Sequence, residues 1–476
     1  MKKKLWGIAA GLICCALCVA AIIVLQRGDD GGGESHIHTH EESSSQEVHS
    51  DGMLASREDI KSVTVTSGGE SFTAVAGQNG AQPHIKELEG IKQDHMLESA
   101  LFSLCSGIRA EKLVEQDASD PEKYGLGEQP LGKAEITYSD GTRTSILVGE
   151  SAPSNERQFY AAIEGQKSVW LVEGSVSVYF TGKAKDYVSK VVSPVAEKTA
   201  AQSAKMTVSK EGAQDIVLER SGEKWSMSAP IKAELDAEKA SGTVNGLYRL
   251  NSEYCEAVRP SDAVKAQYGL DKPAVTVAFS EGSYDLKLKI GRAVVRNDAS
   301  EKEKYYCYLE GGADTDCIYA IAKEYLPWVD ITPQGLLSEI MLPNYLVNLK
   351  SISIDAGGKK TEFIITNEGG DNSRINEDIS KLRTVKVTSG GRELDLVKFR
   401  EFYAYLMSCP TGRLYTNDVK NDAYVTVVFV KNDGSADRLE LVAADGGYGA
   451  RVNGQVSYLV EKSWVDKLIV EIDALG

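Results

Sequence analysis

The chain has 476 residues, of which 42% are hydrophobic and 26% charged, so it can build ordinary globular cores and is long enough for about three domains. Its formal net charge is −16, and because the first 27 residues carry +4, the remainder carries −20. A surface this acidic repels phosphate backbones, so the composition argues against nucleic-acid binding.

The N-terminus has the pattern of a membrane anchor. Lys2–Lys4 precede an uncharged run from Leu5 to Leu25, which as a helix would span a hydrocarbon core of roughly 30 Å. The run exceeds the roughly 7–15 apolar residues of a cleaved signal peptide and ends without a small-residue cleavage site. We therefore expect residues 1–27 to be a cytoplasmic stub and a single-pass signal anchor in the cell membrane. The rest of the chain would lie outside the cytoplasm. Cysteines within the run leave lipidation as an alternative.

Residues 28–57 form a polar segment rich in His, Glu and Ser, which cannot bury enough apolar area to fold. We expect a flexible tether between the anchor and the folded part. His36, His38 and His40 alternate in this tether and are weak candidates for metal ligands, since imidazoles at this spacing can hold a transition metal. A hydrated tether that happens to contain histidine is the simpler interpretation, and no cofactor is predicted.

Three domain-sized repeats follow the tether. Each opens with an alternating strand that leads to a glycine: Val63-Thr64-Val65 before Gly69, Met206-Thr207-Val208 before Gly212, and Ile352-Ser353-Ile354 before Gly358. The glycines are 143 and 146 residues apart, far more than the 20–50 residues of a solenoid repeat. We predict repeat units over residues 58–194 and 195–346 and a divergent unit over 347–476.

Within a unit, the periodicities predict two or three strands, then a helix, then two hairpins and a closing helix. In the second unit the helix is expected over Ala237 to Leu250, with Val244 and Leu247 on its apolar face. The hairpins are expected to pair Val275–Phe279 with Asp285–Ile290, and Tyr305–Leu309 with Cys317–Ala322. The predicted fold class is α+β: tandem, mostly antiparallel sheets with packed helices, preceded by one transmembrane helix.

A short turn marks the first two units. It comprises Tyr124, Gly125 and Leu126 in the first unit and Tyr268, Gly269 and Leu270 in the second, each followed by a proline and a strand. Glycine takes the left-handed conformation that ends a helical turn at little cost. We therefore expect these residues to pack the end of a helical turn onto the sheet, and to have no role in ligand binding.

These features resemble the bacterial family known as domain of unknown function 4340. The resemblance rests on the two Tyr-Gly-Leu turns, the Ser-Asp/Glu-Gly hairpins, and the strand ends at Gly149 and Gly291. It covers about residues 60–345, whereas the third unit has Tyr415-Thr416-Asn417 in place of the turn. The family has no established reaction. The resemblance implies a membrane-anchored accessory protein associated with ABC-2-type transport or gliding-motility components.

The sequence contains few groups suited to catalysis. His84 and His95 are the histidines of the predicted folded part, and neither lies in a recognised nucleophile or metalloprotease motif. Cys307 and Cys317 flank a predicted hairpin turn symmetrically, so a disulfide between them is plausible outside the membrane. Cys105, Cys255 and Cys409 are interpreted as small buried apolar residues.

The sequence thus predicts a non-catalytic, membrane-anchored extracytoplasmic accessory or interaction protein, associated with an ABC-2-type transporter or envelope machinery. It would contact the membrane through Leu5 to Leu25 and a protein partner in the envelope. Two alternatives remain open. One is an extracytoplasmic hydrolase that uses carboxylates in a groove, and the other is a weak metal-binding protein that uses the histidines of the tether.

Overall fold

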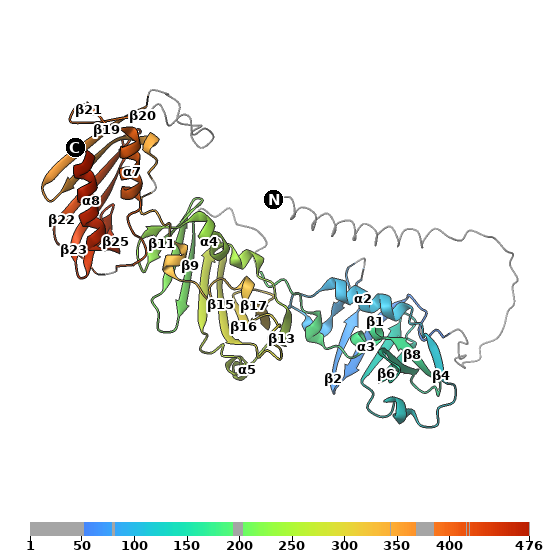
Figure 1. The fold of residues 1–476 in the computed structure, drawn as a ribbon. Coiled ribbons are helices and arrows are strands. Elements are labelled where there is room, and N and C mark those ends of the chain that lie inside the picture. The colour runs from blue at the N-terminus through green and yellow to red at the C-terminus, as the bar shows by residue number, and fades with distance from the viewer. Residues whose placement is uncertain are drawn as a thin grey trace, which may run out of the picture. The chain divides into compact units, whose positions relative to one another are not determined.

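The computed structural model describes residues 52–78, 81–193, 203–342, 344–367, 385–415, 417 and 419–475. The predicted anchor from Leu5 to Leu25 and the tether histidines His36, His38 and His40 lie outside these residues. Three antiparallel sheets, each with helices packed on it, make up the described part (Figure 1). No helix in these ranges is long and apolar enough to cross a membrane.

The first sheet has the strand order β3-β2-β1-β5-β6-β7-β8-β4. Its central strands pair with Val63 opposite Ile136 and Val65 opposite Ala134, and these side chains share one buried face because strand residues alternate between faces. The elements are β1 (Ile60–Ser67), β2 (Glu70–Val75), β3 (His84–Ile85), η1 (Lys86–Leu88), α2 (His95–Ser106), β4 (Lys112–Glu115), η2 (Pro121–Tyr124), β5 (Gly132–Tyr138), β6 (Arg143–Ala152), β7 (Asn155–Ile163), β8 (Val169–Glu173), α3 (Gly174–Phe180) and η3 (Ala184–Tyr187).

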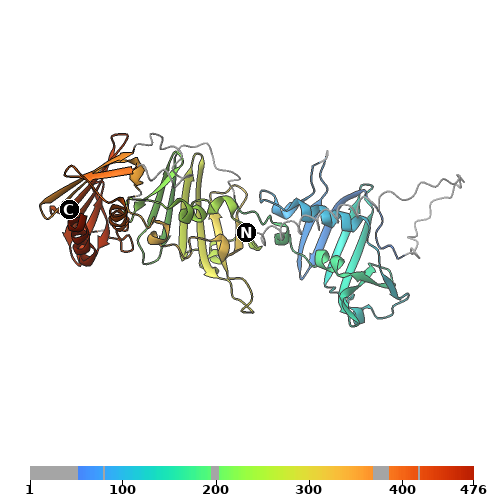
Figure 2. The same cartoon turned by 45° about the horizontal axis from the view of Figure 1, so that its top comes forward.

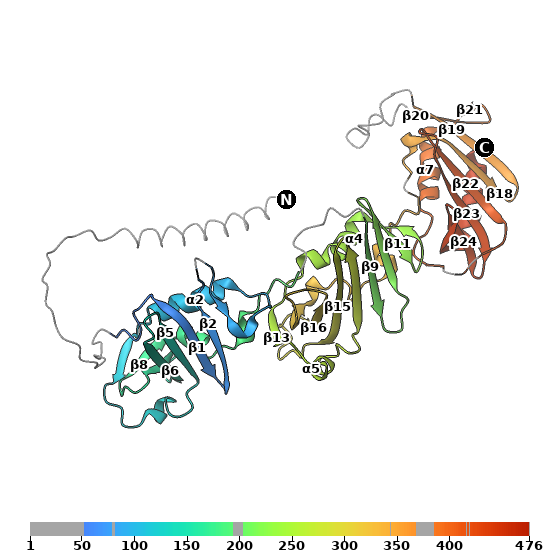
Figure 3. The ribbon, with the colours of Figure 1, turned by 180° about the vertical axis from the view of Figure 1, so that it is seen from behind.

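The second sheet has the order β12-β11-β10-β9-β14-β15-β16-β17-β13, and Figure 3 shows it from behind. Val208 lies opposite Val277 at its centre. The elements are β9 (Ser203–Lys210), β10 (Ile216–Ser221), β11 (Lys224–Ala229), β12 (Ala233–Glu234), α4 (Ala237–Val244), η4 (Gly246–Arg249), β13 (Tyr254–Val258), α5 (Asp262–Gln267), β14 (Val275–Glu281), β15 (Tyr284–Ala293), β16 (Lys304–Glu310), β17 (Cys317–Ala322), η5 (Lys323–Tyr325) and α6 (Pro333–Leu336).

The third sheet has the order β21-β20-β19-β18-β22-β23-β24-β25. Its helices α7 and α8 contact each other and lie side by side in Figures 1 and 2. The elements are η6 (Leu346–Asn348), β18 (Leu349–Ala356), β19 (Lys359–Asn367), β20 (Val385–Ser389), β21 (Arg392–Glu393), α7 (Leu396–Met407), β22 (Ala423–Lys431), β23 (Ala436–Ala444), β24 (Gly447–Val452), β25 (Gln455–Val460) and α8 (Lys462–Leu475).

The three sheets repeat one topology. In each, the first strand pairs on one side with the second strand and on the other with the first strand of the later central hairpin, which is β5, β14 or β22. The helix begins at an aspartate in every case: the side chain of Asp94, Asp236 or Asp395 accepts hydrogen bonds from the two backbone N–H groups two and three residues further on. These bonds satisfy donors that a helix start otherwise leaves unpaired. The predicted repetition of mostly antiparallel sheets with packed helices is confirmed.

The helix of the second unit is shorter than predicted. It was expected to continue to Leu250, but α4 ends at Val244 and a 3-10 turn, η4, follows. Glycine is a poor helix former, and Gly246 follows directly after the C-cap Asn245. A Cβ at position 246 would also lie 2.7 Å from the indole ring of Trp328, so only glycine fits there. The chain tightens there, and η4 carries Leu247 into the core and Tyr248 toward the sheet.

The two Tyr-Gly-Leu turns form as predicted, with Gly125 and Gly269 in the left-handed conformation at φ 68° and 72°. They pack on the face of the sheet that the helices α2 and α4 leave open. Leu126 joins a small apolar cluster there with Ala162 and Val169. Leu270 does the same with Tyr308 and Ile318 in the second sheet. The turn therefore covers a second, smaller core.

Candidate functional site

A row of side chains crosses the second sheet at one end of its strands. Trp225 on β11 lies opposite Arg220 on β10, which lies opposite Ala204 on β9, which in turn lies opposite Glu281 on β14. We call these four residues the charged row. They share a face because side chains alternate along a strand. Arg220 continues the buried series of Ile216 and Leu218 on β10. Glu281 continues the buried series of Val277 and Phe279 on β14.

Arg220 and Glu281 form a buried ion pair across the intervening strand. The Arg220 Nη2 donates to Glu281 Oε1 at 2.6 Å, and the two side chains are 1% and 0% exposed. The pair can form because Ala204 lies between them and its small side chain leaves room for the guanidinium. Taking two charges out of water costs several kcal/mol per ion, so such a pair needs further hydrogen bonds to be tolerated.

Tyr248 supplies one of those bonds. Its hydroxyl donates to Glu281 Oε2, so both carboxylate oxygens accept from protein donors. Burial, and then the hydrogen bond to Glu281, raise the pKa of the Tyr248 hydroxyl well above its usual range. The Tyr248 ring also packs edge-on against Phe279, with ring centroids 6.0 Å apart. The 3-10 turn η4 therefore fixes the carboxylate from above the sheet.

A groove of about 690 Å³ opens beside the charged row, between the β10–β11 hairpin and helix α4. Trp225 and Tyr248 supply aromatic surface to it, and the guanidinium carbon of Arg220 lies 5.9 Å from the centre of the Trp225 ring. Ser226, Ser241 and Asn245 add hydroxyl and amide groups to the lining. Such a mixture of aromatic surface and a few polar groups is typical of ligand-binding clefts.

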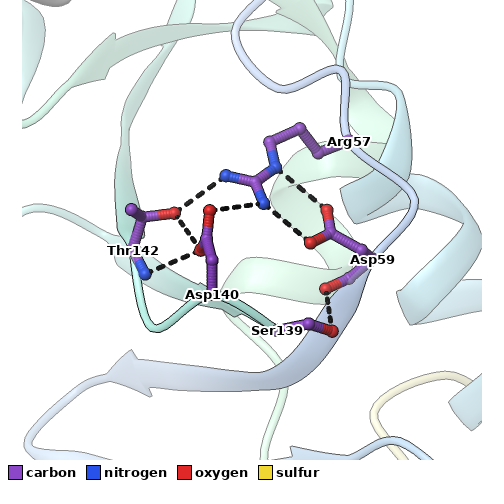
Figure 4. A network of polar contacts seen from close by, with 5 residues as sticks. All are labelled: Arg57, Asp59, Ser139, Asp140 and Thr142. Carbon is purple, nitrogen blue, oxygen red and sulfur yellow. Dashed lines mark hydrogen bonds and ion pairs between the residues drawn. The ribbon is translucent and has the colours of Figure 1, made fainter. Parts of the chain in front are cut away.

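The first sheet has different chemistry at the equivalent position. There Tyr138, which lies 143 residues before Glu281, is opposite Ile60 on β1, whereas Glu281 is opposite Ala204 on β9. Arg57 stacks over the Tyr138 ring at 4.1 Å. It also bonds Asp59 and Asp140 at 2.7 and 2.9 Å (Figure 4). Hydrogen bonds from the Thr142 side chain and backbone hold the pKa of Asp140 at about 2. This network is exposed.

A second buried carboxylate lies on α2. Glu98 is fully buried, and its Oε2 is 2.7 Å from Nδ1 of His95, which is half exposed. Among the described residues, Glu98 Oε1 has no hydrogen-bond partner. Burial raises the pKa of Glu98 because the charged form is poorly solvated there, although the hydrogen bond from His95 opposes the shift. Glu98 does not line the groove beside the charged row.

The predicted disulfide between Cys307 and Cys317 does not form in the structure, where both are free buried thiols. The hairpin register is the reason. Cys307 lies opposite Tyr319 and Tyr308 lies opposite Ile318, so Cys317 is displaced along β17 from the position that faces Cys307. Cys105, Cys255 and Cys409 are also buried, as predicted. The symmetric spacing about the turn did not determine the register.

The other predicted residues have structural surroundings. The hydroxyls of Tyr124 and Tyr268 donate to Glu115 and Glu256, at 2.6 and 3.1 Å, which fixes each turn against the edge strand of its sheet. His84 and His95 do not belong to a group of three metal-ligating side chains, because no such group exists within the described ranges. Trp225 and Tyr248 were not predicted as site residues. The buried pair had a sequence signal, since Arg220 and Glu281 each continue an apolar alternation.

One segment of the chain matches a known family model. Residues 97–273 match the model of the family described as "Domain of unknown function (DUF4340)". The matched segment contains both Tyr-Gly-Leu turns and runs from α2 to the residues just before β14, so the DUF4340 match confirms the resemblance there. No curated protein matches the chain.

Proposed function

We propose that this protein is a non-catalytic, membrane-anchored extracytoplasmic interaction protein, and that the groove beside the charged row is a contact surface for its partner. An envelope assembly such as an ABC-2-type transporter is the partner that the family resemblance implies. The anchor from Leu5 to Leu25 would hold the three sheets at the outer surface of the cell membrane.

The observation that carries the proposal is the bonding of Glu281. Both of its oxygens accept hydrogen bonds from Arg220 and Tyr248, and its side chain is fully buried. A general base needs an oxygen that can reach a substrate proton, whereas this carboxylate is occupied by fixed protein donors. The bonding of Glu281 therefore favours a structural role for the charged row beside the groove over a catalytic role.

The groove has the features of a contact surface. Trp225 and Tyr248 offer flat amphipathic area, and Lys224 and Glu223 at its rim can bond polar groups of a partner. Aromatic residues on a rigid element contribute strongly to protein interfaces because they bury large areas and lose little side-chain entropy. Since Trp225 lies on β11 opposite the buried Arg220, its backbone is held in place by the sheet.

The test is co-purification of the full chain from its native membrane in mild detergent. We expect an envelope protein to be recovered with the wild type, and its recovery to fall at least tenfold with Trp225→Ala. Tyr424→Ala is the matched control, since Tyr424 is a 42% exposed aromatic residue on the third sheet. Recovery of no membrane or envelope partner would count against the proposal. Equal losses in both variants would show that the partner does not bind at the groove.

A carboxylate-based hydrolase is the second candidate, because Glu223 and Glu234 both line the same groove. Two carboxylates that flank a bound substrate can act as acid and base or nucleophile. Assays of the full chain against chromogenic esters and glycosides would detect such an activity. Turnover that is lost in both Glu223→Gln and Glu234→Gln would favour the hydrolase over the interaction protein.

A further inference from the structure

The buried pair of His95 and Glu98 at the start of α2 is not required by the repeated fold. Glu98 is the fourth residue after the capping aspartate of its helix, and the residues at this position in α4 and α7 are Ala240 and Phe399. All three side chains are buried. The fold therefore accommodates an apolar side chain at this position in two units, whereas the first unit places a carboxylate in its core.

The partner of Glu98 is also specific to the first unit. His95 is the first residue after the capping aspartate, where α4 and α7 have Ala237 and Leu396. Nδ1 of His95 lies 2.7 Å from Glu98 Oε2, and the His95 side chain is 56% exposed. The imidazole therefore contacts a buried carboxylate on one side and can exchange protons with water on the other.

His95 is the cationic partner of Glu98 in the structure. Of the elements packed on α2, β1 buries only apolar side chains, and β3 contributes His84, which is exposed. Tyr187 on η3 and Cys105 on α2 are buried nearby. Burial raises the pKa of the Tyr187 hydroxyl and of the Cys105 thiol, so both stay uncharged between pH 5 and 8.

Loss of the proton that this pair shares would leave a carboxylate in the core without a cation. Among the described residues, Glu98 Oε1 has no hydrogen-bond partner, so the protein solvates this charge poorly. The first turn of α2 is the nearest route to water, since the helix begins three residues before Glu98. That turn is held by its cap. The Asp94 side chain accepts from the N–H groups of Met96 and Leu97, and the Asp94 N–H donates to the Tyr187 oxygen at 2.8 Å.

We propose that His95 and Glu98 form a pH-sensitive switch in the first turn of α2. While the pair keeps its proton, the turn is closed and Glu98 stays buried. As the pH rises and the proton passes to water, the turn unwinds in a growing fraction of molecules and brings the carboxylate to solvent. Unwinding would also weaken the bridge of Gln93 to Val188, in the segment that leads along the chain to the second unit. The proposal does not depend on the groove beside the charged row or on its partner.

The test is hydrogen–deuterium exchange of the full chain in detergent, followed by mass spectrometry at several pH values between 5 and 8. Protection factors compare the measured exchange rate with the intrinsic rate at each pH, and so remove the direct effect of pH on exchange. We expect the protection of the first turn of α2 to fall by roughly tenfold or more from pH 5 to pH 8, because opening is linked to the release of a proton. The peptide of α7 that contains Phe399 should keep constant protection.

Four variants separate the switch from a general effect of pH. Glu98→Gln and Glu98→Met both remove the titrating group, so protection should no longer depend on pH. The apolar residues at the equivalent position of α4 and α7 indicate that Glu98→Met will fold. His95→Gln should move the pH at which protection falls. Glu89→Gln, which changes an exposed carboxylate just before α2, should behave as the wild type.

Three results would overturn the proposal. Constant protection of the first turn in the wild type would show that no proton is linked to its opening. An equal fall in the peptide of α7 would show that the whole chain loses stability, and a fall that persists in both Glu98 variants would assign it to another group. An unchanged profile in His95→Gln would remove the imidazole from the switch. His84→Gln should keep the fall, since His84 makes no ion pair with Glu98 among the described contacts.

Discussion

The first and second sheets differ at one equivalent position in their central strands. In the first sheet Tyr138 faces inward, and the charges around it lie outside in the network of Arg57, Asp59 and Asp140 (Figure 4). In the second sheet the charges lie inside, as the buried pair of Arg220 and Glu281. One repeated backbone therefore accommodates a solvated network in one copy and a desolvated pair in the other.

The two sheets also show that the same short sequence motif can occupy different structural positions. Ser139-Asp140-Gly141 and Ser280-Glu281-Gly282 look like two copies of one hairpin turn. In the structure Asp140 lies in the turn and its side chain is 50% exposed, whereas Glu281 is the last residue of β14 and is fully buried. The first hairpin has a longer turn, so the same tripeptide occupies a different place in the sheet.

The largest expected effect comes from breaking the buried pair. Arg220→Ala would leave the Glu281 carboxylate buried without its cation, and removing one partner of a buried pair destabilises a protein by about 3–5 kcal/mol. Urea unfolding followed by tryptophan fluorescence would measure the loss, since Trp225 lies beside Arg220. The double variant Arg220→Met with Glu281→Leu should recover most of it, because no charge then remains buried. A double variant as unstable as the single one would contradict this explanation.

The next effect concerns a feature that the two sheets share. A Cβ at Gly291 would lie 2.2 Å from the backbone oxygen of Tyr268, and one at Gly149 would lie 2.1 Å from that of Tyr124. Gly291→Ala should therefore displace the Tyr-Gly-Leu turn and lower the free energy of unfolding by about 1–3 kcal/mol. Gly242→Ala on α4 is the matched control, because a Cβ there meets no atom within 4 Å. Equal urea midpoints for the two variants would refute the packing role.

Sequence reasoning predicted the repeat, the strand pairs at the centre of each unit and the Tyr-Gly-Leu turns, because these depend on local periodicity and on glycine conformation. It failed where register matters. The pairing of Cys307 with Cys317 assumed a symmetric hairpin, and the displacement of one strand against the other decided otherwise. The groove could not be predicted from the sequence either, because Trp225, Asn245 and Tyr248 come together only through the packing of α4 and η4 on the sheet.

Glu98 provides a smaller test, within the first unit. Its pKa is raised by burial, so the folded state binds the proton more tightly than the unfolded chain, whose carboxyl titrates near 4.5. Protonated Glu98 therefore contributes its full share of stability at pH values below 4.5. This contribution is lost as the pH rises through the folded-state pKa. Glu98→Met should therefore raise the free energy of unfolding at pH 7 by about 1 kcal/mol and change it little at pH 4. An equal gain at both pH values would contradict the titration.

The smallest effect is expected in the exposed network of the first sheet. Arg57→Ala should leave the urea midpoint at pH 7 almost unchanged, because water solvates the freed carboxylates of Asp59 and Asp140. Asp140 matters in acid instead. Its folded-state pKa of about 2 lies below its ordinary value of 3.8, so its contribution is present above pH 4 and is lost as the pH falls toward 2.

Asp140→Asn should therefore make the first sheet less sensitive to pH between 4 and 2, and Glu135→Gln is a suitable control on the same hairpin. Thr142→Val should have nearly the same effect as Asp140→Asn, since the Thr142 hydroxyl bonds Oδ1 of Asp140 at 2.6 Å. The measurement is hydrogen exchange of the β5 and β6 amides across this pH range. A loss on Arg57→Ala as large as that on Arg220→Ala would show that burial does not separate the two networks.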